Sequence, residues 1–230
     1  MAFITIAIPT MRRWSFLKES IPFYLSRPEV GEIVICDETG EDIEEIRKSS
    51  FGKDSKLQLF TNETRLGIYH NKRKSLGLST MPWVAVLDSD NQFPESWFET
   101  ISFYIESKKM ATKLSMFGSP SFYSINIKTG YTYQPCKNLS DLTLSKTNWN
   151  SIFTKPGWNH LLNDGNWVVP KEAYKALPEK IPEAYKKGAE FCDALFSLFC
   201  FIKNGYTIYY PEDLTYNHIV HDESSWLTRD

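Results

Sequence analysis

Short apolar segments alternate with amphipathic segments along residues 3–108. Four segments are apolar, or alternate between apolar and polar positions, over the length of a strand: 3–8, 32–36, 56–60 and 83–87. Four others carry apolar residues at helical spacing: 14–25, 42–48, 69–78 and 95–108. Strands that alternate with helices are typical of βαβ units, so this half predicts a mainly parallel sheet flanked by helices.

The pattern is less regular in the second half. Residues 115–135 predict strands or a hairpin around Gly130, whereas 138–163 is polar and aromatic and predicts a loop with short helices. Four more elements are expected towards the C-terminus: a strand at 165–170, helices at 171–177 and 188–204, and a strand at 207–210. We therefore expect one α/β domain over residues 1–230, with a mainly parallel mixed central sheet, whose second half shapes a second pocket.

Composition narrows the class of protein. The 230 residues are 42% hydrophobic and 23% charged, which is typical of a soluble globular protein, and the formal charge of -2 indicates no nucleic-acid partner. Four scattered cysteines predict neither a zinc site nor a disulfide framework, and they fit a reducing compartment. The N-terminus reads as a strand rather than a signal peptide, and no apolar run approaches the roughly 20 residues of a membrane helix. We expect a cytoplasmic protein without a membrane anchor.

One buried strand runs directly into two acidic residues. Residues 84–87 are apolar, and Asp88 and Asp90 follow at once, separated by Ser89. The carboxyl edge of an open α/β sheet is where such folds bind ligands. An Asp-x-Asp pair there predicts a site for Mn²⁺ or Mg²⁺ that binds a diphosphate in turn, because hard cations prefer carboxylate and phosphate oxygens. The structural alternative is a plain turn, since serine and aspartate are common turn residues.

Two other strand ends carry candidate ligand-binding residues. Pro9 and Thr10 end the first strand, where proline removes a backbone donor and frees the following backbone to face a ligand. Asp37 and Glu38 end the second strand, where a carboxylate can accept a hydrogen bond from a ribose hydroxyl or a base N–H. For each pair the structural alternative is an ordinary strand end or turn.

A basic segment follows the third strand. Gly67 precedes Asn71, Lys72, Arg73 and Lys74 at the start of a predicted helix beside the sheet edge. Cationic side chains in that position neutralise phosphate groups. A solvated basic helix face would have the same sequence.

Together these residues resemble the GT-A glycosyltransferases, and most closely the family-2-like members. In that family the first strand ends in Pro-Thr or Pro-Ser, an Asp after the second strand contacts the nucleotide, and a Gly precedes an Arg-Asn pair upstream of Asp-x-Asp. The spacing from Gly67 to Asp88 matches the family without gaps. On that register Lys72 and Arg73 occupy the Arg-Asn positions, so Arg replaces Asn, and Asn71 substitutes for it if the helix starts earlier.

The second half resembles the family at an acidic motif and at a histidine. Glu190 and Asp193 are three positions apart and lie on one face of the predicted helix. The resemblance implies that one of them is the general base, although acidic residues at a helix N-terminus are also favoured by the macrodipole alone. His218 is implied to bind the metal or the diphosphate, with His221 as a competitor, whereas a lone histidine is more often structural.

The resemblance implies metal-dependent transfer of a sugar from a nucleotide-diphosphate sugar, with a UDP-sugar as donor. Asp90 is expected to contact the metal directly, Asp88 to contact the ribose or a metal-bound water, and Ser89 to line the donor site. The base removes the proton of an acceptor hydroxyl, and a single displacement inverts the anomeric centre. Residues 1–100 then form the nucleotide-sugar-binding half and 101–230 the acceptor-binding half.

Aromatic residues are expected on the acceptor side. They make up 15% of the chain, and residues 149–167 contain Trp149, Trp158 and Trp167. Trp158 and Trp167 are candidate stacking platforms for a glycan, protein or small-molecule acceptor, although tryptophan is also a common core residue. The same segment is a candidate lid that orders when donor binds.

Two other functions fit the same kind of fold. A nucleotidyltransferase carries a Gly-rich phosphate loop after its first strand, and residues 9–13 contain no glycine. A non-catalytic nucleotide-sugar-binding module would keep the fold and bind the donor without turnover.

Overall fold

The structure is a computed structural model that describes residues 2–106, 112–134, 142–158, 161, 166–186 and 193–222. The first half contains β1 (Ile4–Thr10), α1 (Trp14–Ser26), β2 (Val30–Asp37), α2 (Glu41–Lys48), β3 (Leu57–Thr61), α3 (Ile68–Leu78), β4 (Trp83–Val86) and α4 (Glu95–Glu106). The second half contains β5 (Ser115–Phe117), β6 (Ser121–Asn126), β7 (Thr132–Tyr133), β8 (Leu142–Leu144), α5 (Ser151–Thr154), β9 (Val168–Pro170), α7 (Asp193–Lys203), β10 (Thr207–Tyr210) and β11 (Thr215–Val220). Two 3₁₀ helices, η2 (Lys171–Ala176) and η3 (Glu183–Tyr185), lie between β9 and α7.

The hydrophobic pattern predicts the first half closely, since every expected strand and helix is present to within one or two residues. The hairpin around Gly130 is also confirmed, because β6 and β7 pair antiparallel. The pattern misses β8 and β11. β8 has three residues, too few for a periodicity, and β11 mixes asparagine and histidine with its apolar positions. The helix expected at 171–177 is a 3₁₀ helix, and the one expected from residue 188 is described from Asp193.

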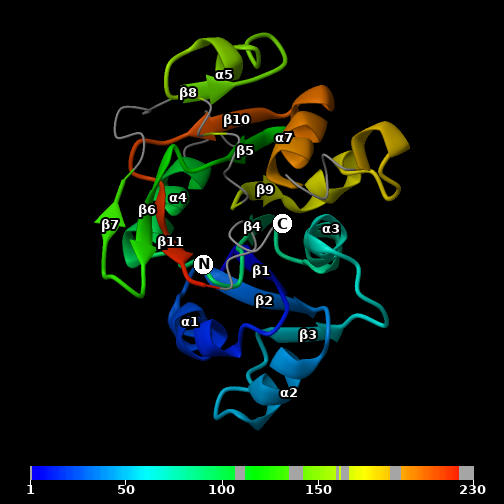
Figure 1. The fold of residues 1–230 in the computed structure, drawn as a ribbon, viewed down its shortest axis with the longest axis vertical. Coiled ribbons are helices and arrows are strands. Elements are labelled where there is room, and N and C mark those ends of the chain that lie inside the picture. Colours follow the sequence, from blue (N-terminus) through cyan, green and yellow to red (C-terminus); the bar gives the residue numbers. More distant parts are fainter. Residues whose placement is uncertain are drawn as a thin grey trace.

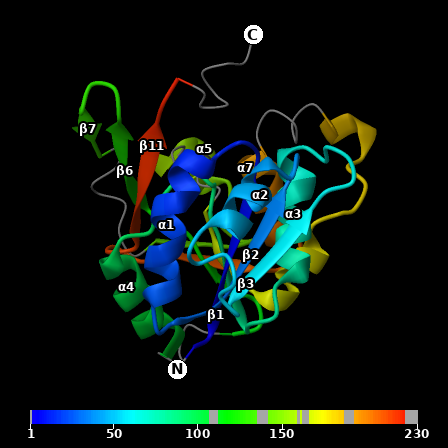
Figure 2. The same ribbon diagram turned by 90° about the horizontal axis from the view of Figure 1, so that it is seen from below.

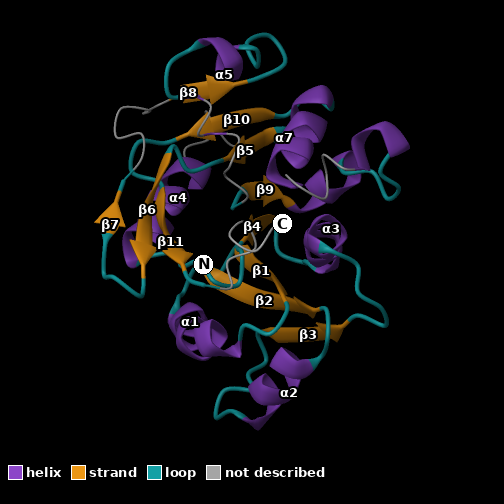
Figure 3. Ribbon diagram, in the orientation of Figure 1, coloured by secondary structure: helices purple, strands orange, loops and turns teal. Residues whose placement is uncertain are grey.

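One eight-stranded sheet runs through both halves of the chain, in the order β3-β2-β1-β4-β9-β5-β10-β8 (Figures 1 and 3). Strands β1 to β4 pair in parallel, and β10 pairs in parallel with β5. β9 lies antiparallel between β4 and β5, and β8 is antiparallel to β10. The α/β class with a mainly parallel mixed sheet is therefore confirmed, and the pairing of β4 with β9 joins the two halves in a single sheet.

Helices cover both faces of this sheet and bury two hydrophobic clusters. Helices α1, α2 and α4 pack apolar residues such as Leu17, Ile43 and Trp97 against one face. Helix α3, η2 and α7 pack Tyr69, Ala173 and Phe201 within the cluster on the other face. Figure 1 shows α1 and α4 on one side of the sheet and α3 and α7 on the other, and Figure 2 turns α1 and α2 towards the viewer. Burial on both faces explains why β1 and β2 read as nearly continuous apolar runs.

A second sheet of three strands, in the order β11-β6-β7, stands beside the main one. It is attached through the loop after β4, where Gln92 and Asn217 exchange two backbone hydrogen bonds of 2.9 and 2.8 Å. The amide of Ile219 also donates to Oδ1 of the buried Asn91 (3.3 Å). These contacts place β11, near the end of the chain, against the turn that carries the Asp-x-Asp motif. Within the described ranges, no helix is long and apolar enough to cross a membrane.

Candidate active site

The Asp-x-Asp motif forms a turn at the carboxyl end of β4. The backbone N–H of Asp88 donates to Oδ1 of Asn166 (2.9 Å), and that of Asn91 donates to the carbonyl of Asp88 (2.8 Å). The Asp88 side chain is 35% exposed and that of Asp90 is 22% exposed, and Ser89 between them is partly exposed. Both carboxylates can therefore meet a ligand at the edge of the sheet that open α/β folds use for binding.

A buried ammonium group links this turn to the start of α7. Nζ of Lys72, on α3, lies 2.7 Å from Oδ1 of Asp88 and 3.0 Å from Oδ2 of Asp193. Burial alone lowers the pKa of Lys72, but the charges of Asp193 and Asp88 outweigh it, and the pKa lies above its usual range. Burial raises the pKa of the Asp88 carboxyl, with Asp193 and Asp90 acting in the same direction and Lys72 opposing them. Lys72 is therefore a charged group shared by two carboxylates.

Asp90 has partners of its own. Nε2 of His221 lies 3.0 Å from Asp90 Oδ2, and Nε of Arg13 lies 3.8 Å from the same oxygen. The His221 ring also packs on Phe16, with centroids 4.8 Å apart. His218 lies on β11 beside Phe122, and burial lowers its pKa, with Asp90 raising it and His221 lowering it. Of the two histidines, His221 is the one in direct contact with Asp90, so the competitor named from the sequence has the closer position.

The residues around Asp90 fit a cation that is shared with a bound ligand. In the parts of the chain that the structure describes, no group of three or more His, Cys, Asp or Glu side chains is arranged to hold a metal. Asp90 and His221 together offer a carboxylate oxygen and an imidazole nitrogen. Mg²⁺ and similar cations are commonly bound by one or two carboxylates together with substrate phosphates and waters. The donor set therefore fits a cation completed by a diphosphate rather than a cage made by protein alone.

The residues at the ends of β1 and β2 divide into structural and available groups. The Thr10 hydroxyl donates to Asp42 Oδ2 (2.6 Å), and the Asp37 carboxylate accepts from the backbone of Thr39 (3.0 Å) and Ile43 (3.2 Å). Both side chains thus hold the start of α2. In Glu38, Oε2 accepts from the backbone N–H of Leu66 (2.6 Å), but Oε1 is buried without a hydrogen-bond partner among the described residues. Glu38 therefore keeps one oxygen that a ligand can use.

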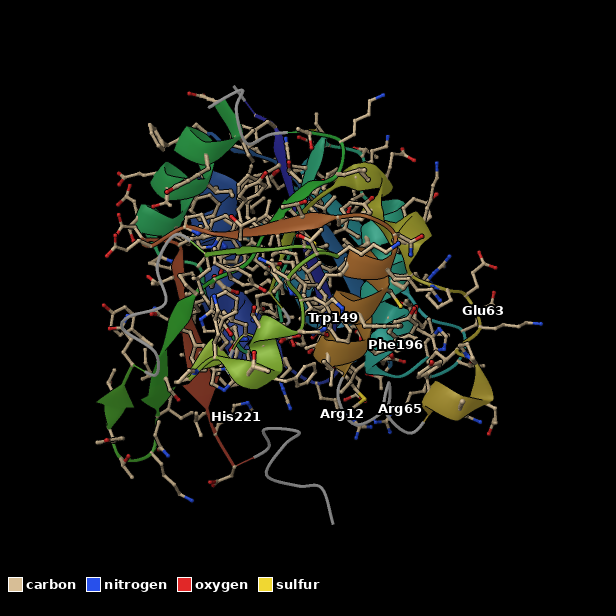
Figure 4. All side chains as sticks on the ribbon, turned by 90° about the horizontal axis from the view of Figure 1, so that it is seen from above. Arg12, Glu63, Arg65, Trp149, Phe196 and His221 are labelled. Atoms are coloured by element: carbon tan, nitrogen blue, oxygen red, sulfur yellow. The ribbon has the colours of Figure 1, made fainter. Side chains whose placement is uncertain are left out.

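Side chains from both halves of the chain lie in the same half of the molecule. Arg12 follows β1, Glu63 and Arg65 lie between β3 and α3, Phe196 is on α7, Trp149 precedes α5, and His221 follows β11. Figure 4 shows all six in the lower half of its view.

A family model supplies the decisive comparison. The model described as glycosyl transferase family 2 matches residues 5–141. The chain belongs to glycosyl transferase family 2. The resemblance expected from the sequence is confirmed, and the match covers the strand ends and the Asp-x-Asp turn described above.

Solved structures show the same fold for this family-2 chain. The crystal structure of S. aureus TarS 1-349 in complex with UDP-GlcNAc matches with a TM-score of 0.66 and 16% identity, over 100% of this chain and 62% of that one. The structure of TarS 1-349 in complex with UDP matches with a TM-score of 0.63 and 17% identity, over 97% and 62%. The family-2 chain thus spans less than two thirds of the TarS proteins it matches, and identity at this level shows the fold alone. A search of curated proteins found no match.

Two residues on the family-2 register have roles within the fold. Asn71 is buried, donates to the carbonyl of Cys36 (2.9 Å) and accepts from Asn62 (3.0 Å), so it fastens α3 to β2. Arg73 Nε donates to the carbonyl of Leu177 (2.8 Å), on the second-half side of α3. Because adjacent helical residues do not face each other, Arg73 points away from Lys72 and the carboxylates. The sequence-based expectation that Arg73 meets the donor phosphates disagrees with this placement.

Gly67 lies at the start of α3, and Pro9 lies near the end of β1. Gly67 has φ of +81° and begins α3, and its carbonyl accepts from the N–H of Asn71 (2.9 Å). A Cβ there would meet no atom within 4 Å, so the backbone conformation, not crowding, favours glycine. Pro9 lies within β1, opposite Cys36 of β2. Both residues border the edge where Glu38 and Asp88 lie.

The tryptophans expected on the acceptor side lie in the core. Trp167 is 1% exposed and packs edge-on against Phe201, at 5.5 Å between ring centroids. Trp158 is 8% exposed and belongs to the same cluster, with Nζ of Lys155 at 4.5 Å from its ring centroid. A sugar stacks on an open ring face, so the expectation is wrong for Trp167, which has none. Glu190, the other base candidate, lies outside the described residues, whereas Asp193 is placed beside Lys72.

Sequence reasoning missed the role of Arg13 and Asp42. The backbone N–H of Arg13 donates to Asp42 Oδ1 (2.8 Å), which fixes the turn after β1. Arg12, next to it, has φ of +58° and is the single non-glycine residue in the left-handed region among the described residues. Such strain is concentrated near functional sites. The available signal was a pair of arginines, separated from the strand-ending Pro-Thr by Met11 alone.

Proposed function

We propose that this family-2 domain transfers a sugar from a nucleotide-diphosphate sugar to an acceptor hydroxyl, with inversion and with a divalent cation. The proposal is carried by one observation at the carboxyl edge of the sheet. Lys72 contacts both Asp88 and Asp193, and His221 contacts Asp90 in the same Asp-x-Asp turn. A uridine diphosphate sugar is the donor class of choice, because TarS, which shares the fold, has been crystallised with UDP-GlcNAc and with UDP.

The nucleotide would lie between the ends of β1 and β2. The buried Oε1 of Glu38 suits an N–H of the base or a ribose hydroxyl, because a buried acceptor without a partner is costly and gains from a donor. Pro9 and Gly67 border the same space and bring backbone close to the ligand. We therefore expect the nucleoside next to Glu38 and the diphosphate next to the Asp-x-Asp turn.

The diphosphate would be held at Asp90. Asp90 and His221 are the side chains that would bind Mn²⁺ or Mg²⁺ there, with Asp88 beside them. When bound, such a cation neutralises the charge that builds on the leaving diphosphate. Arg13, at 3.8 Å from Asp90, adds a positive charge to the same place.

The sugar transfer itself needs a base on the acceptor side. Asp193, or Glu190 at the other end of the acidic motif, would take the proton of the acceptor hydroxyl. The acceptor oxygen then bonds to the anomeric carbon as the bond from that carbon to the diphosphate oxygen breaks. Attack from the face opposite the leaving group inverts the configuration, through an oxocarbenium-like transition state.

A binding and turnover panel tests the proposal. UDP-GlcNAc, UDP, UMP and GDP-mannose are added with and without Mn²⁺, and the melting temperature is measured. A true ligand at one hundred times its Kd adds about 2.7 kcal/mol of stability, which raises the melting temperature by roughly 5–10 °C for a chain of this size. Release of UDP from UDP-sugar is followed in parallel. Binding without any turnover favours a binding module, consumption of a nucleoside triphosphate favours a nucleotidyltransferase, and no shift with any nucleotide overturns the proposal.

A further inference from the structure

The geometry points to Lys72 as a positioning residue that holds the candidate base Asp193 against Asp88, and not as a ligand of the donor diphosphate. This inference rests on the proposed function and deepens it. It assigns a separate purpose to a residue that the family-2 register places among the phosphate-binding positions.

The position of Lys72 joins three elements from both halves of the chain. Its side chain leaves α3 and is only 7% exposed, and its Nζ lies between Asp88 at the end of β4 and Asp193 at the first described residue of α7. An ammonium group has three N–H donors. Nζ is within ion-pair distance of two carboxylates, and burial of the side chain leaves this group little access to a phosphate outside. The side chain is therefore placed to hold protein groups together.

The two carboxylates depend on this ammonium. The Asp193 side chain is 13% exposed, so water solvates its charge poorly. Asp88 lies within ion-pair distance of the same Nζ. Like charges in a partly buried site repel, and one of them protonates or moves away unless a cation lies between them. Lys72 thus fixes Asp193 at a set distance from the turn that receives the donor. A base held in this way stays in place to take the proton of the acceptor hydroxyl that attacks the anomeric carbon.

A phosphate ligand and a positioning residue make different predictions for Lys72→Met. Loss of a charge-assisted hydrogen bond to phosphate weakens UDP binding by about 10- to 100-fold. Loss of a positioning residue leaves the Kd of Mn²⁺–UDP within about 3-fold, while kcat for sugar transfer falls by about 10² or more, as for loss of a general base. The KM for donor changes little, because the donor contacts at Asp90 and Glu38 are untouched.

The experiment uses Lys72→Met, Lys72→Arg and Lys203→Met. Lys203 is an exposed lysine at the C-terminal end of α7, the end opposite Asp193, so it is the matched control. Titration calorimetry gives the Kd of Mn²⁺–UDP, and steady-state transfer gives kcat and KM. We expect Lys203→Met to behave as wild type and Lys72→Arg to recover part of the lost kcat, because it restores the charge in a different shape. A UDP Kd at least tenfold weaker in Lys72→Met overturns the inference.

A second pair of variants covers the case in which Lys72→Met does not fold, since breaking a buried ion pair is strongly destabilising. Asp193→Asn is compared with the double variant Lys72→Met/Asp193→Asn, which removes both members of the pair. If Lys72 acts through Asp193, the double variant has the UDP affinity and residual kcat of Asp193→Asn to within about 3-fold, because residues that act as a unit are not additive. Additive losses, or an Asp193→Asn enzyme with wild-type kcat, overturn the inference. A wild-type chain that neither binds UDP nor turns over any UDP-sugar overturns the proposed function itself.

Discussion

Nε2 of His221 lies 3.0 Å from Oδ2 of Asp90, although His221 follows β11 and Asp90 follows β4. The contact exists because β11 is bonded to the loop after β4 through Gln92 and Asn217. A segment near the C-terminus therefore completes a site that begins in the first half. The predictions below test what each member of this site contributes.

Replacing Asp90 tests the cation site. Asp90→Asn removes the charge but keeps the shape, and we expect Mn²⁺ to stop improving UDP binding, with affinity in Mn²⁺ reduced by about tenfold or more because a charge-assisted contact is lost. Titration calorimetry with and without Mn²⁺ measures this. Asp213→Asn, at an exposed position between β10 and β11, is the control. Unchanged Mn²⁺ dependence in Asp90→Asn would count against a cation at Asp90.

The two histidines are separable by substitution. His221→Gln is expected to weaken Mn²⁺-dependent UDP binding more than His218→Gln, because His221 contacts Asp90 directly whereas His218 packs beside Phe122. Each variant is titrated with Mn²⁺ at fixed UDP, and the half-saturating Mn²⁺ concentration is compared. A larger effect of His218→Gln than of His221→Gln would indicate that His218 binds the metal, as the sequence first led us to expect.

Glu38 is expected to recognise the nucleoside and not the diphosphate. Glu38→Gln keeps an oxygen for the N–H of Leu66 but removes the negative charge, and we expect UDP affinity to fall by about 10- to 100-fold. Affinity for Mn²⁺–pyrophosphate, which has no nucleoside, should not change. Glu44→Gln, an exposed change on α2, is the control. Equal losses for UDP and pyrophosphate would show that Glu38 acts on the fold of the site as a whole.

Arg73 is expected to be dispensable for donor binding. Arg73→Met removes the hydrogen bond to the Leu177 carbonyl and a mostly solvent-exposed ion pair with Glu179. The free energy of unfolding should fall by about 1 kcal/mol, measured by urea denaturation, because one such hydrogen bond is lost. The Kd for UDP should stay within about twofold of wild type. A tenfold weaker Kd would restore Arg73 to the phosphate site.

Trp167 is expected to matter for stability and not for sugar stacking. Trp167→Ala removes a side chain that is 1% exposed and should lower the free energy of unfolding by about 3–5 kcal/mol. Trp167→Phe keeps the apolar contacts with Phe201, and it also removes a buried indole N–H that has no partner among the described residues, so it should lose less. KM for the acceptor in Trp167→Phe should equal that of wild type. A raised acceptor KM with unchanged stability would contradict this placement.

The local pattern was enough to predict most of the first half. Strands that are buried on both faces, such as β1 and β2, are apolar at nearly every position. Their sequences are therefore recognisable as continuous apolar runs. The Asp-x-Asp turn could be found for the same reason, because two carboxylates after a buried strand are unusual. β8 and β11 were missed, since a three-residue strand and a strand with mixed polarity leave no periodic signal.

Side-chain partners were harder to predict than elements. Asn71 and Arg73 both read as phosphate contacts, yet one fastens α3 to β2 and the other reaches Leu177 in the second half. Which way each residue faces depends on the rotation of α3 against the sheet, and one step along a helix turns the side chain to another face. The aromatic richness of residues 149–167 likewise could not separate a core tryptophan from a surface one.

The sequence alone determined the alternation of strands and helices, the family and the acidic ends of the strands, because these are properties of neighbouring residues. Only the tertiary structure decided that Lys72 lies between Asp88 and Asp193 and that His221 meets Asp90. Those contacts join residues that are far apart in the chain. They form only when the sheet brings β4 and β9 together and β11 docks beside the turn. That packing cannot be predicted from the pattern of neighbouring residues.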